Sequence, residues 1–134
     1  MAWGEKAASK FRHVRHLPRL VAAVRPVSEP SQPIHGELGG NMLDHEALPP
    51  AVIDFSPYWR PLPFATAAVV ADALVWQGAD ASRLAVVRHI GNVGQYLLRA
   101  LIYRVVTGEV LGRGAGYDRP VRTGRRAACG LATR

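Results

Sequence analysis

The stretch that decides the fold runs from residue 35 to residue 56 and reads HGELGGNMLDHEALPPAVIDFS. Its beginning holds three glycines within five residues, and that much backbone freedom excludes a regular helix. DHEALPP is a polar turn closed by two prolines, and the AVIDF after it is a short β-type run. We therefore predict a β-hairpin, with strands at about 41–44 and 51–54 and loops at its open end.

Four polar residues surround this hairpin, namely His35, Glu37, Asn41 and Asp54. Phosphoryl transfer needs a carboxylate that orients the attacking hydroxyl, and oxygen ligands that hold magnesium against the phosphates. Glu37 could supply the carboxylate, and Asn41 and Asp54 are suitable oxygen ligands. Two neighbouring loops at the open end of a hairpin would let these side chains converge. The alternative interpretation is a polar turn beside a short hairpin.

The run HGELGGNML (35–43), followed by VIDFS (52–56), resembles the catalytic loop and the metal loop of the aminoglycoside phosphotransferase and kinase-like superfamily. Together with the following ADALVW, it is especially similar to an uncharacterised bacterial branch. The resemblance is fairly specific over residues 34–76, weakens through residue 107 and is absent from the tail.

This resemblance implies roles for individual residues. Glu37 stands at the position of the catalytic base or hydroxyl-positioning residue, and Asn41 and Asp54 stand at the positions of magnesium ligands. His35 would brace the loop, and Asp72 would tie the catalytic loop down. The implied activity is transfer of phosphate from ATP, with Mg²⁺, to a hydroxyl of a small molecule.

Three departures from the family pattern weaken the prediction of an enzyme. Glu37 replaces an aspartate, and misplacing a catalytic group by about 1 Å can cost about a hundredfold in rate. The spacing from Glu37 to Asn41 is one residue shorter than in most of the superfamily. The 34 residues before His35 contain neither a glycine-rich strand-turn-strand nor a strand lysine, since Lys6 and Lys10 lie in helix-like sequence. We therefore expect the isolated chain to be inactive without an ATP-binding N-terminal lobe.

The fold class expected from these patterns is α+β and mainly α-helical, a kinase-like C-terminal lobe fragment whose β-hairpin carries the catalytic and metal loops. The expected parts are a basic N-terminal helix at 1–25, a proline-rich linker at 26–33, the lobe core at 34–108 and a basic, poorly ordered tail at 109–134.

Three further predictions concern the helical part. Residues 56–63, SPYWRPLP, contain three prolines and are not expected to form a strand. A helix is predicted from Phe64 to Gln77. A second helix is predicted from an N-cap at Ser82 to about Val106, with Gly108 as its stop signal.

Composition narrows the classes of function. The chain has 134 residues, 49% of them hydrophobic, which is enough for one domain with a core. Its one cysteine, Cys129, excludes an intramolecular disulfide and a cysteine-based zinc site. We find no secretory signal and no apolar run long enough to span a membrane, so we expect a cytoplasmic protein with no membrane partner.

The net charge of +7 leaves other functions open. Arg60, in the loop after Asp54, could contact phosphate. The tail arginines could bind nucleic acid, although a solvated tail fits better because no aromatic stacking platform accompanies them. The competing hypotheses are a non-catalytic basic module for nucleic acid or a protein partner, and a gene fragment without function of its own. The tail arginines are Arg119, Arg122, Arg125 and Arg126.

Overall fold

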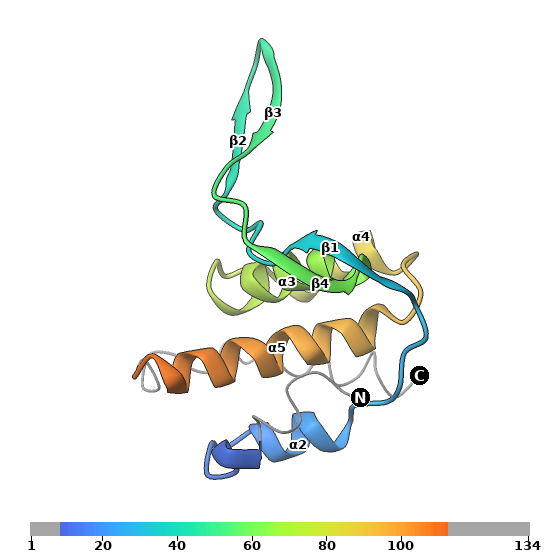
Figure 1. Ribbon diagram of the computed structural model, residues 1–134, viewed down its shortest axis with the longest axis vertical. Coiled ribbons are helices and arrows are strands. Elements are labelled where there is room, and N and C mark those ends of the chain that lie inside the picture. Colours follow the sequence, from blue (N-terminus) through green and yellow to red (C-terminus); the bar gives the residue numbers. More distant parts are fainter. Residues whose placement is uncertain (1–8, 113–134) are drawn as a thin grey trace.

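The computed structural model describes residues 9–112, and the rest of the chain, including Cys129 and the predicted basic tail beyond Gly112, lies outside the described residues. The described part is α+β, with helices and two small antiparallel sheets, which agrees with the expected fold class at that level. Figure 1 shows the long helix α5 (Val93–Val110) between α3 (Pro63–Val75) on one side and α2 (Leu17–Ala22) on the other.

One basic helix over 1–25 was predicted, but the described residues from 9 to 25 form two short helical pieces, η1 (Ser9–Phe11) and α2. Pro18 occupies the first turn of α2. A proline has no N–H to donate, and its ring clashes with the carbonyl four residues earlier, so it favours the start of a helix over the interior. The proline therefore begins a new helix at Leu17 instead of kinking a longer one.

The first sheet pairs β1 (Ser31–His35) with β4 (Pro57–Pro61) in antiparallel register. The prediction that SPYWRPLP forms no strand was therefore wrong, and the predicted linker 26–33 ends earlier, at β1. Proline is tolerated on strand edges, where its missing N–H is not needed. In a two-stranded sheet every strand is an edge strand, and two of the prolines stand at the ends of β4.

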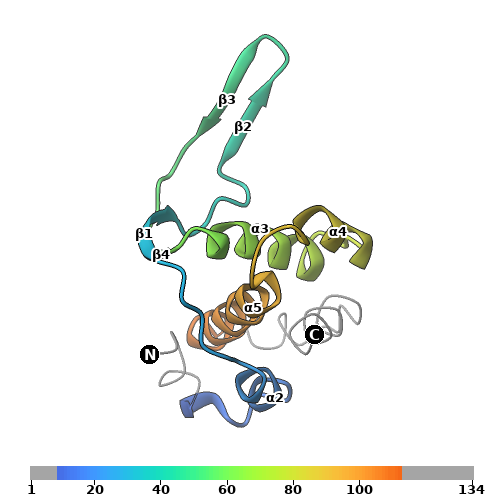
Figure 2. The ribbon, with the colours of Figure 1, turned by 90° about the vertical axis from the view of Figure 1, so that its right-hand side faces the viewer.

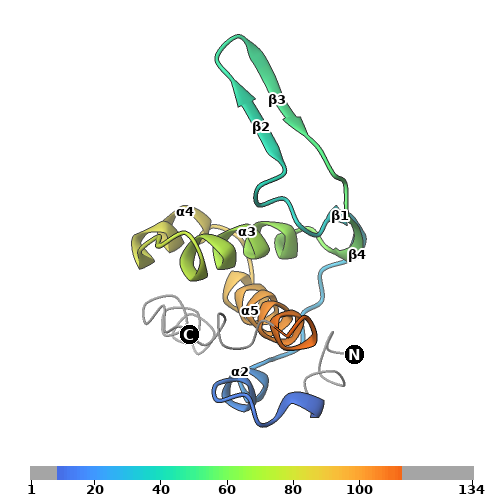
Figure 3. The same ribbon diagram turned by 90° about the vertical axis from the view of Figure 1, so that its left-hand side faces the viewer.

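The predicted hairpin is confirmed as β2 (Met42–His45) paired with β3 (Leu48–Val52). Its second strand begins three residues earlier than predicted, so the two prolines expected to close the turn lie inside β3. Every residue of both strands is exposed. Figures 1, 2 and 3 show the hairpin projecting away from the helices. Its open end, where the two predicted functional loops lie, joins it to the first sheet.

The predicted helix at Phe64–Gln77 is confirmed as α3, with bounds one or two residues away. The second predicted helix is instead divided into η2 (Ala81–Arg83), α4 (Leu84–Val87) and α5. The break comes at Gly91 and Asn92, and Asn92 has a left-handed backbone with φ 56°. The predicted N-cap Ser82 lies inside η2. The N-cap of η2 is Asp80, whose carboxylate accepts the Ser82 N–H at 2.6 Å. Gly108 is no stop signal either, since it is buried inside α5.

The hydrophobic core lies mainly between α3 and α5. Small residues of α3, Ala67 and Ala71, are fully buried and let the two helices approach closely. Large residues of α5 fill the space between them, among them Tyr96, Leu97 and Leu98, all with no exposed surface. Leu17 of α2 closes the other side. This core fixes α5 beneath the first sheet and thereby positions the loops at the ends of β1 and β4.

Candidate functional site

His35, the last residue of β1, connects the two loops. Its Nδ1 atom accepts the backbone N–H of Glu37 at 3.1 Å, and its Nε2 atom lies 3.3 Å from the carbonyl oxygen of Ile53. An Nδ1 atom that accepts requires the hydrogen to be on Nε2, which then donates to Ile53. The Gly36 N–H donates to the Ser56 carbonyl at 2.8 Å, so backbone and side chain both hold the 35–41 loop beside the 53–56 loop.

Asn41 stabilises its own loop. Its side-chain Nδ2 donates to the Glu37 carbonyl at 2.8 Å, and its backbone N–H donates to Leu38 at 3.0 Å. The Asn41 carbonyl accepts the N–H of Ile53 at 2.9 Å. Asp54 therefore directly follows a residue whose N–H is hydrogen-bonded to Asn41. The convergence of the Asn41 and Asp54 side chains stays a prediction.

Asp54 is exposed and has a left-handed backbone with φ 49°. This conformation is uncommon outside glycine, and aspartate and asparagine tolerate it best. Such backbone outliers occur often at functional sites. The turn directs the chain out of the hairpin and into β4.

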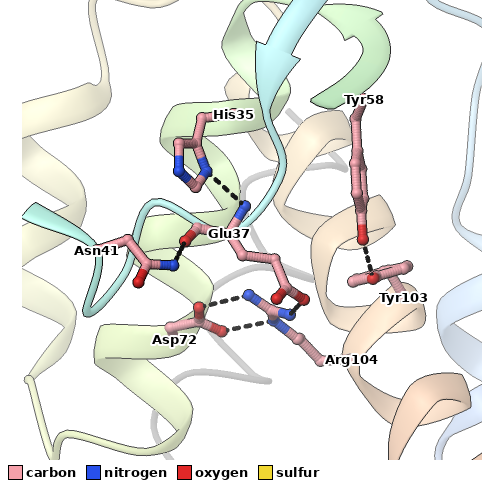
Figure 4. A network of polar contacts seen from close by, with 7 residues as sticks. All are labelled: His35, Glu37, Asn41, Tyr58, Asp72, Tyr103 and Arg104. Atoms are coloured by element: carbon pink, nitrogen blue, oxygen red, sulfur yellow. Dashed lines mark hydrogen bonds and ion pairs between the residues drawn. The ribbon is translucent and has the colours of Figure 1, made fainter. Parts of the chain in front are cut away.

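Glu37 forms an ion pair that the sequence did not predict. Its Oε1 atom lies 3.1 Å from Nη1 of Arg104 in α5. Nε and Nη2 of the same guanidinium donate to both carboxylate oxygens of Asp72 in α3, at 2.8 and 2.7 Å. Figure 4 shows the Arg104 guanidinium between the two carboxylates. We call these three residues the Arg104 network.

Burial differs along the Arg104 network. The side chains of Arg104 and Asp72 are 13% and 12% exposed, whereas that of Glu37 is 43% exposed. Burial lowers the pKa of Arg104, but the hydrogen bonds and charge of Asp72, followed by those of Glu37, raise the pKa more, so it lies above its usual value. Arg104 is thus a fixed cation that holds Glu37 in place.

Asp72 also lies close to the glycine-rich loop itself. A Cβ atom added at Gly39 would lie 3.2 Å from Oδ2 of Asp72, which is a tight contact. The carboxylate therefore sits against the loop backbone and is joined to Glu37 through Arg104. This is the neighbourhood that the resemblance implied for Asp72, although the connection to Glu37 runs through a residue that the sequence had not singled out.

Tyr58 of β4 packs behind the 35–41 loop. A Cβ atom at Gly36 would lie 2.5 Å from the Tyr58 ring, so only glycine fits there. The Tyr58 hydroxyl is hydrogen-bonded to the hydroxyl of Tyr103 in α5 (Figure 4). Burial, followed by this hydrogen bond, raises the pKa of Tyr58 well above its usual value. Tyr58 is therefore a neutral packing group that links the loop to α5.

Arg60 does not join the two loops. Its Nη1 atom donates to the Trp59 carbonyl at 2.6 Å, and its side chain lines a cavity between β4 and α5. That lining includes none of His35, Glu37, Asn41 or Asp54.

Sequence reasoning missed Arg104 and Tyr103. Both lie in the run ALIYRVV (100–106), whose apolar residues predicted only a core-facing helix. The one available signal was an arginine inside an otherwise apolar segment, because a charge in such a place usually has a partner.

The donor types at the two loops fit a magnesium ion, because Mg²⁺ prefers oxygen ligands and is commonly held by one or two carboxylates together with substrate phosphates. No group of three or more His, Cys, Asp or Glu within residues 9–112 could hold a metal ion by itself. Over the same residues, no helix is long and apolar enough to cross a membrane. Comparisons with protein-family models, curated proteins and solved structures each gave no match.

Proposed function

We propose that this chain is a relative of the kinase-like phosphotransferases, a C-terminal lobe whose 35–41 and 53–56 loops form the hydroxyl- and metal-binding half of a phosphotransfer site. The observation that carries the proposal is the hydrogen bonding between these loops. Ile53 bonds to Asn41 at 2.9 Å and to His35 at 3.3 Å, and Ser56 bonds to Gly36 at 2.8 Å. Two loops with the required residue types are thereby held side by side.

In this proposal Glu37 acts as a hydroxyl-positioning residue. Arg104 holds the Glu37 carboxylate at 3.1 Å, and a carboxylate oxygen can accept a hydrogen bond from a substrate hydroxyl. The 43% exposure of the Glu37 side chain leaves it open to such a substrate. Phosphoryl transfer depends mainly on positioning and electrostatic stabilisation, so a carboxylate held by an arginine is suited to the task.

Asn41 and Asp54 are the residues proposed to hold Mg²⁺, which when bound would neutralise phosphate charge. His35 keeps both loops in register by accepting from Glu37 and donating to Ile53. The chain's only lysines, Lys6 and Lys10, come before residue 31 of the sequence, where β1 begins. We further propose that phosphate transfer from ATP requires an ATP-binding lobe joined to this one.

A thermal unfolding titration with Mg-ATP at millimolar concentration tests the proposal. A ligand that binds only the folded state raises the unfolding temperature as its concentration increases. We expect this rise for the unmodified chain and for Asp44→Asn, a matched control on the exposed strand β2. Asp54→Asn, which keeps a residue that tolerates the left-handed backbone, should lose most of the rise.

Two outcomes would contradict the proposal. One is an equal rise in all three proteins, and the other is no rise in any of them. ATP with EDTA in place of magnesium is the second control, and it should leave the unfolding temperature unchanged. A rise that persists in EDTA would show that the nucleotide binds without the metal ligands.

A further inference from the structure

The β2–β3 hairpin projects from the helices and has two outer edges, one along β2 and one along β3 (Figures 1 and 2). In the described part of the chain, neither edge is paired with a further strand. A strand edge presents unpaired N–H and C=O groups, and proteins usually protect such edges with lysine, proline or a bulge. The two edges of this hairpin differ in that protection.

The outer edge of β3 is blocked. Pro49 and Pro50 lie inside β3 and have no N–H to donate to a further strand. The pairing register shifts at the same level of the hairpin, so that Asp44 of β2 stands opposite both prolines. A bulge of this kind interrupts the row of hydrogen-bonding groups and bends the strand. A further strand therefore finds no continuous row of donors along β3.

The outer edge of β2 has no such protection. β2 contains no proline, and the chain contains no lysine or arginine from residue 26 to residue 59. In an antiparallel pair, the main-chain groups of successive residues point alternately toward the partner strand and away from it. The Ile53 N–H donates to the Asn41 carbonyl at 2.9 Å, which fixes this alternation. The N–H and C=O groups of Met42 and Asp44 therefore point away from β3.

The open edge of β2 is complementary to a second copy of itself. When two copies lie antiparallel with Leu43 opposite Leu43, Met42 of each copy stands opposite Asp44 of the other. The main-chain groups of these residues face the neighbouring copy, so each Met42–Asp44 pair exchanges hydrogen bonds in both directions. The central leucines meet as a non-hydrogen-bonded pair, in which side chains come closest. No two like charges stand directly opposite each other.

Pairing through β2 would also give the apolar side chains of the hairpin new neighbours. Residues directly opposite each other share a face of a sheet, so Leu43 lies on one face with Ala51, and Met42 lies on the other with Val52. Leu43 and Met42 are 53% and 51% exposed. A lone hairpin is marginally stable in water, whereas a sheet of three or more strands with an apolar face is more stable.

We propose that two copies of this chain pair through β2 into a symmetric dimer, with a joined sheet in the order β3–β2–β2–β3. Since the two β2 strands run antiparallel, the helical parts of the two copies lie at opposite ends of the joined sheet. The blocked β3 edges stand outermost, so assembly stops at two copies instead of continuing into a fibre.

The dimer has a consequence for the loops at the base of the hairpin. In the same register, His45 of each copy stands opposite Asn41 of the other. The hairpin turn of one copy thereby approaches the 35–41 loop of its neighbour. The pairing itself needs neither magnesium nor ATP, and it is independent of the proposed phosphotransfer.

Sedimentation velocity of the full chain over a concentration series tests the pairing. We expect the sedimenting mass to rise with concentration from that of one chain toward that of two. Leu43→Lys should weaken dimerisation at least about tenfold, because it removes the central apolar pair and places like charges directly opposite each other. Leu48→Lys is the matched control. It adds the same charge at an exposed leucine of β3, and it should dimerise as the unmodified chain does.

Cysteine cross-linking tests the register. Cys129→Ser leaves the chain without a cysteine, and each test cysteine is added to that background. Leu43→Cys should form an intermolecular disulfide rapidly under mild oxidation, since directly opposite Cβ atoms of antiparallel strands lie about 4.5–5.5 Å apart and are closer in non-hydrogen-bonded pairs. Leu48→Cys should cross-link much more slowly. Non-reducing gel electrophoresis measures both rates.

The mass of a single chain at every concentration up to the solubility limit would overturn the proposal. So would a Leu43→Lys protein that dimerises as well as Leu48→Lys, or equal cross-linking rates for Leu43→Cys and Leu48→Cys. Asp54→Asn should dimerise as the unmodified chain does, so failure of this proposal and failure of the phosphotransfer proposal are separate results.

Discussion

Arg104 joins two acidic residues that come from different elements, Glu37 in a loop and Asp72 in α3. Replacing it by methionine would leave the Asp72 carboxylate buried without its cation. Removing one partner of a buried ion pair costs about 3–5 kcal/mol. We therefore expect Arg104→Met to lower the free energy of unfolding by about that amount, measured by urea denaturation.

Arg88→Met is the matched control, because Arg88 is exposed and exposed substitutions usually change stability by less than about 0.5 kcal/mol. In the double variant Arg104→Met/Asp72→Leu both charges are gone, so part of the lost stability should return. A single variant Arg104→Met as stable as its control would contradict the assignment of Arg104 as the residue that holds the site together.

At the residue scale, the sequence located the loops but not the contacts between them. The closely spaced glycines predicted a loop, because they exclude a regular helix, and the polar residues in and after it suggested Glu37, Asn41 and Asp54 as site residues. The partnership of Glu37 with Arg104 spans 67 positions of the chain. Such a contact depends on how α5 crosses α3, which periodicity does not specify.

The β2–β3 hairpin is expected to contribute little to stability. Its strands pair only with each other, all their residues are exposed, and a lone two-stranded hairpin is marginally stable in water. We expect Leu48→Ala in β3 to change the free energy of unfolding by less than about 0.5 kcal/mol.

Leu98→Ala in α5 is the matched comparison, since it removes the same side chain from a site with no exposed surface. Emptying such a site costs about 2–5 kcal/mol. Urea denaturation of both variants measures the difference. A loss of similar size for Leu48→Ala would mean that the hairpin packs against the rest of the molecule in solution.

At the element scale, prediction succeeded where one local rule dominated. The hairpin and α3 each have a consistent pattern ended by turn residues. Prediction failed for β4, because three prolines argue against a strand inside a sheet but are tolerated in an edge strand, and the sequence does not show that β4 is an edge strand. It failed again at residues 88–92, where the apolar spacing continues across Gly91 and Asn92 although the left-handed Asn92 interrupts the helix.

At the scale of the whole molecule, Glu29 fastens the segment before β1 to the start of α5. Its carboxylate accepts from the Tyr96 hydroxyl and from the Asn92 side chain, both at 2.7 Å. The hydrogen bond from Tyr96, followed by that from Asn92, lowers the pKa of Glu29 below its ordinary value of 4.5. The ionised form therefore stabilises the folded chain above that pH, and this stabilisation is lost as the pH falls through the lowered pKa.

We expect the stability difference between the unmodified chain and Glu29→Gln to be largest near neutral pH and to shrink below about pH 4.5. Thermal unfolding across a pH series measures it. Glu46→Gln, in the exposed hairpin turn, is the control and should show no such dependence. A difference that stays constant down to acidic pH would contradict the fastening role of the Glu29 carboxylate.

The central claim is that Asn41 and Asp54 hold a divalent cation between the two loops, and Mn²⁺ tests it most directly because it broadens NMR signals of nearby nuclei. We expect selective broadening of the amides of residues 37–41 and 53–56. The broadening should persist in Asp44→Asn and disappear in Asp54→Asn. Broadening centred on the hairpin turn at 44–46, or unchanged in Asp54→Asn, would contradict a cation site formed by Asn41 and Asp54.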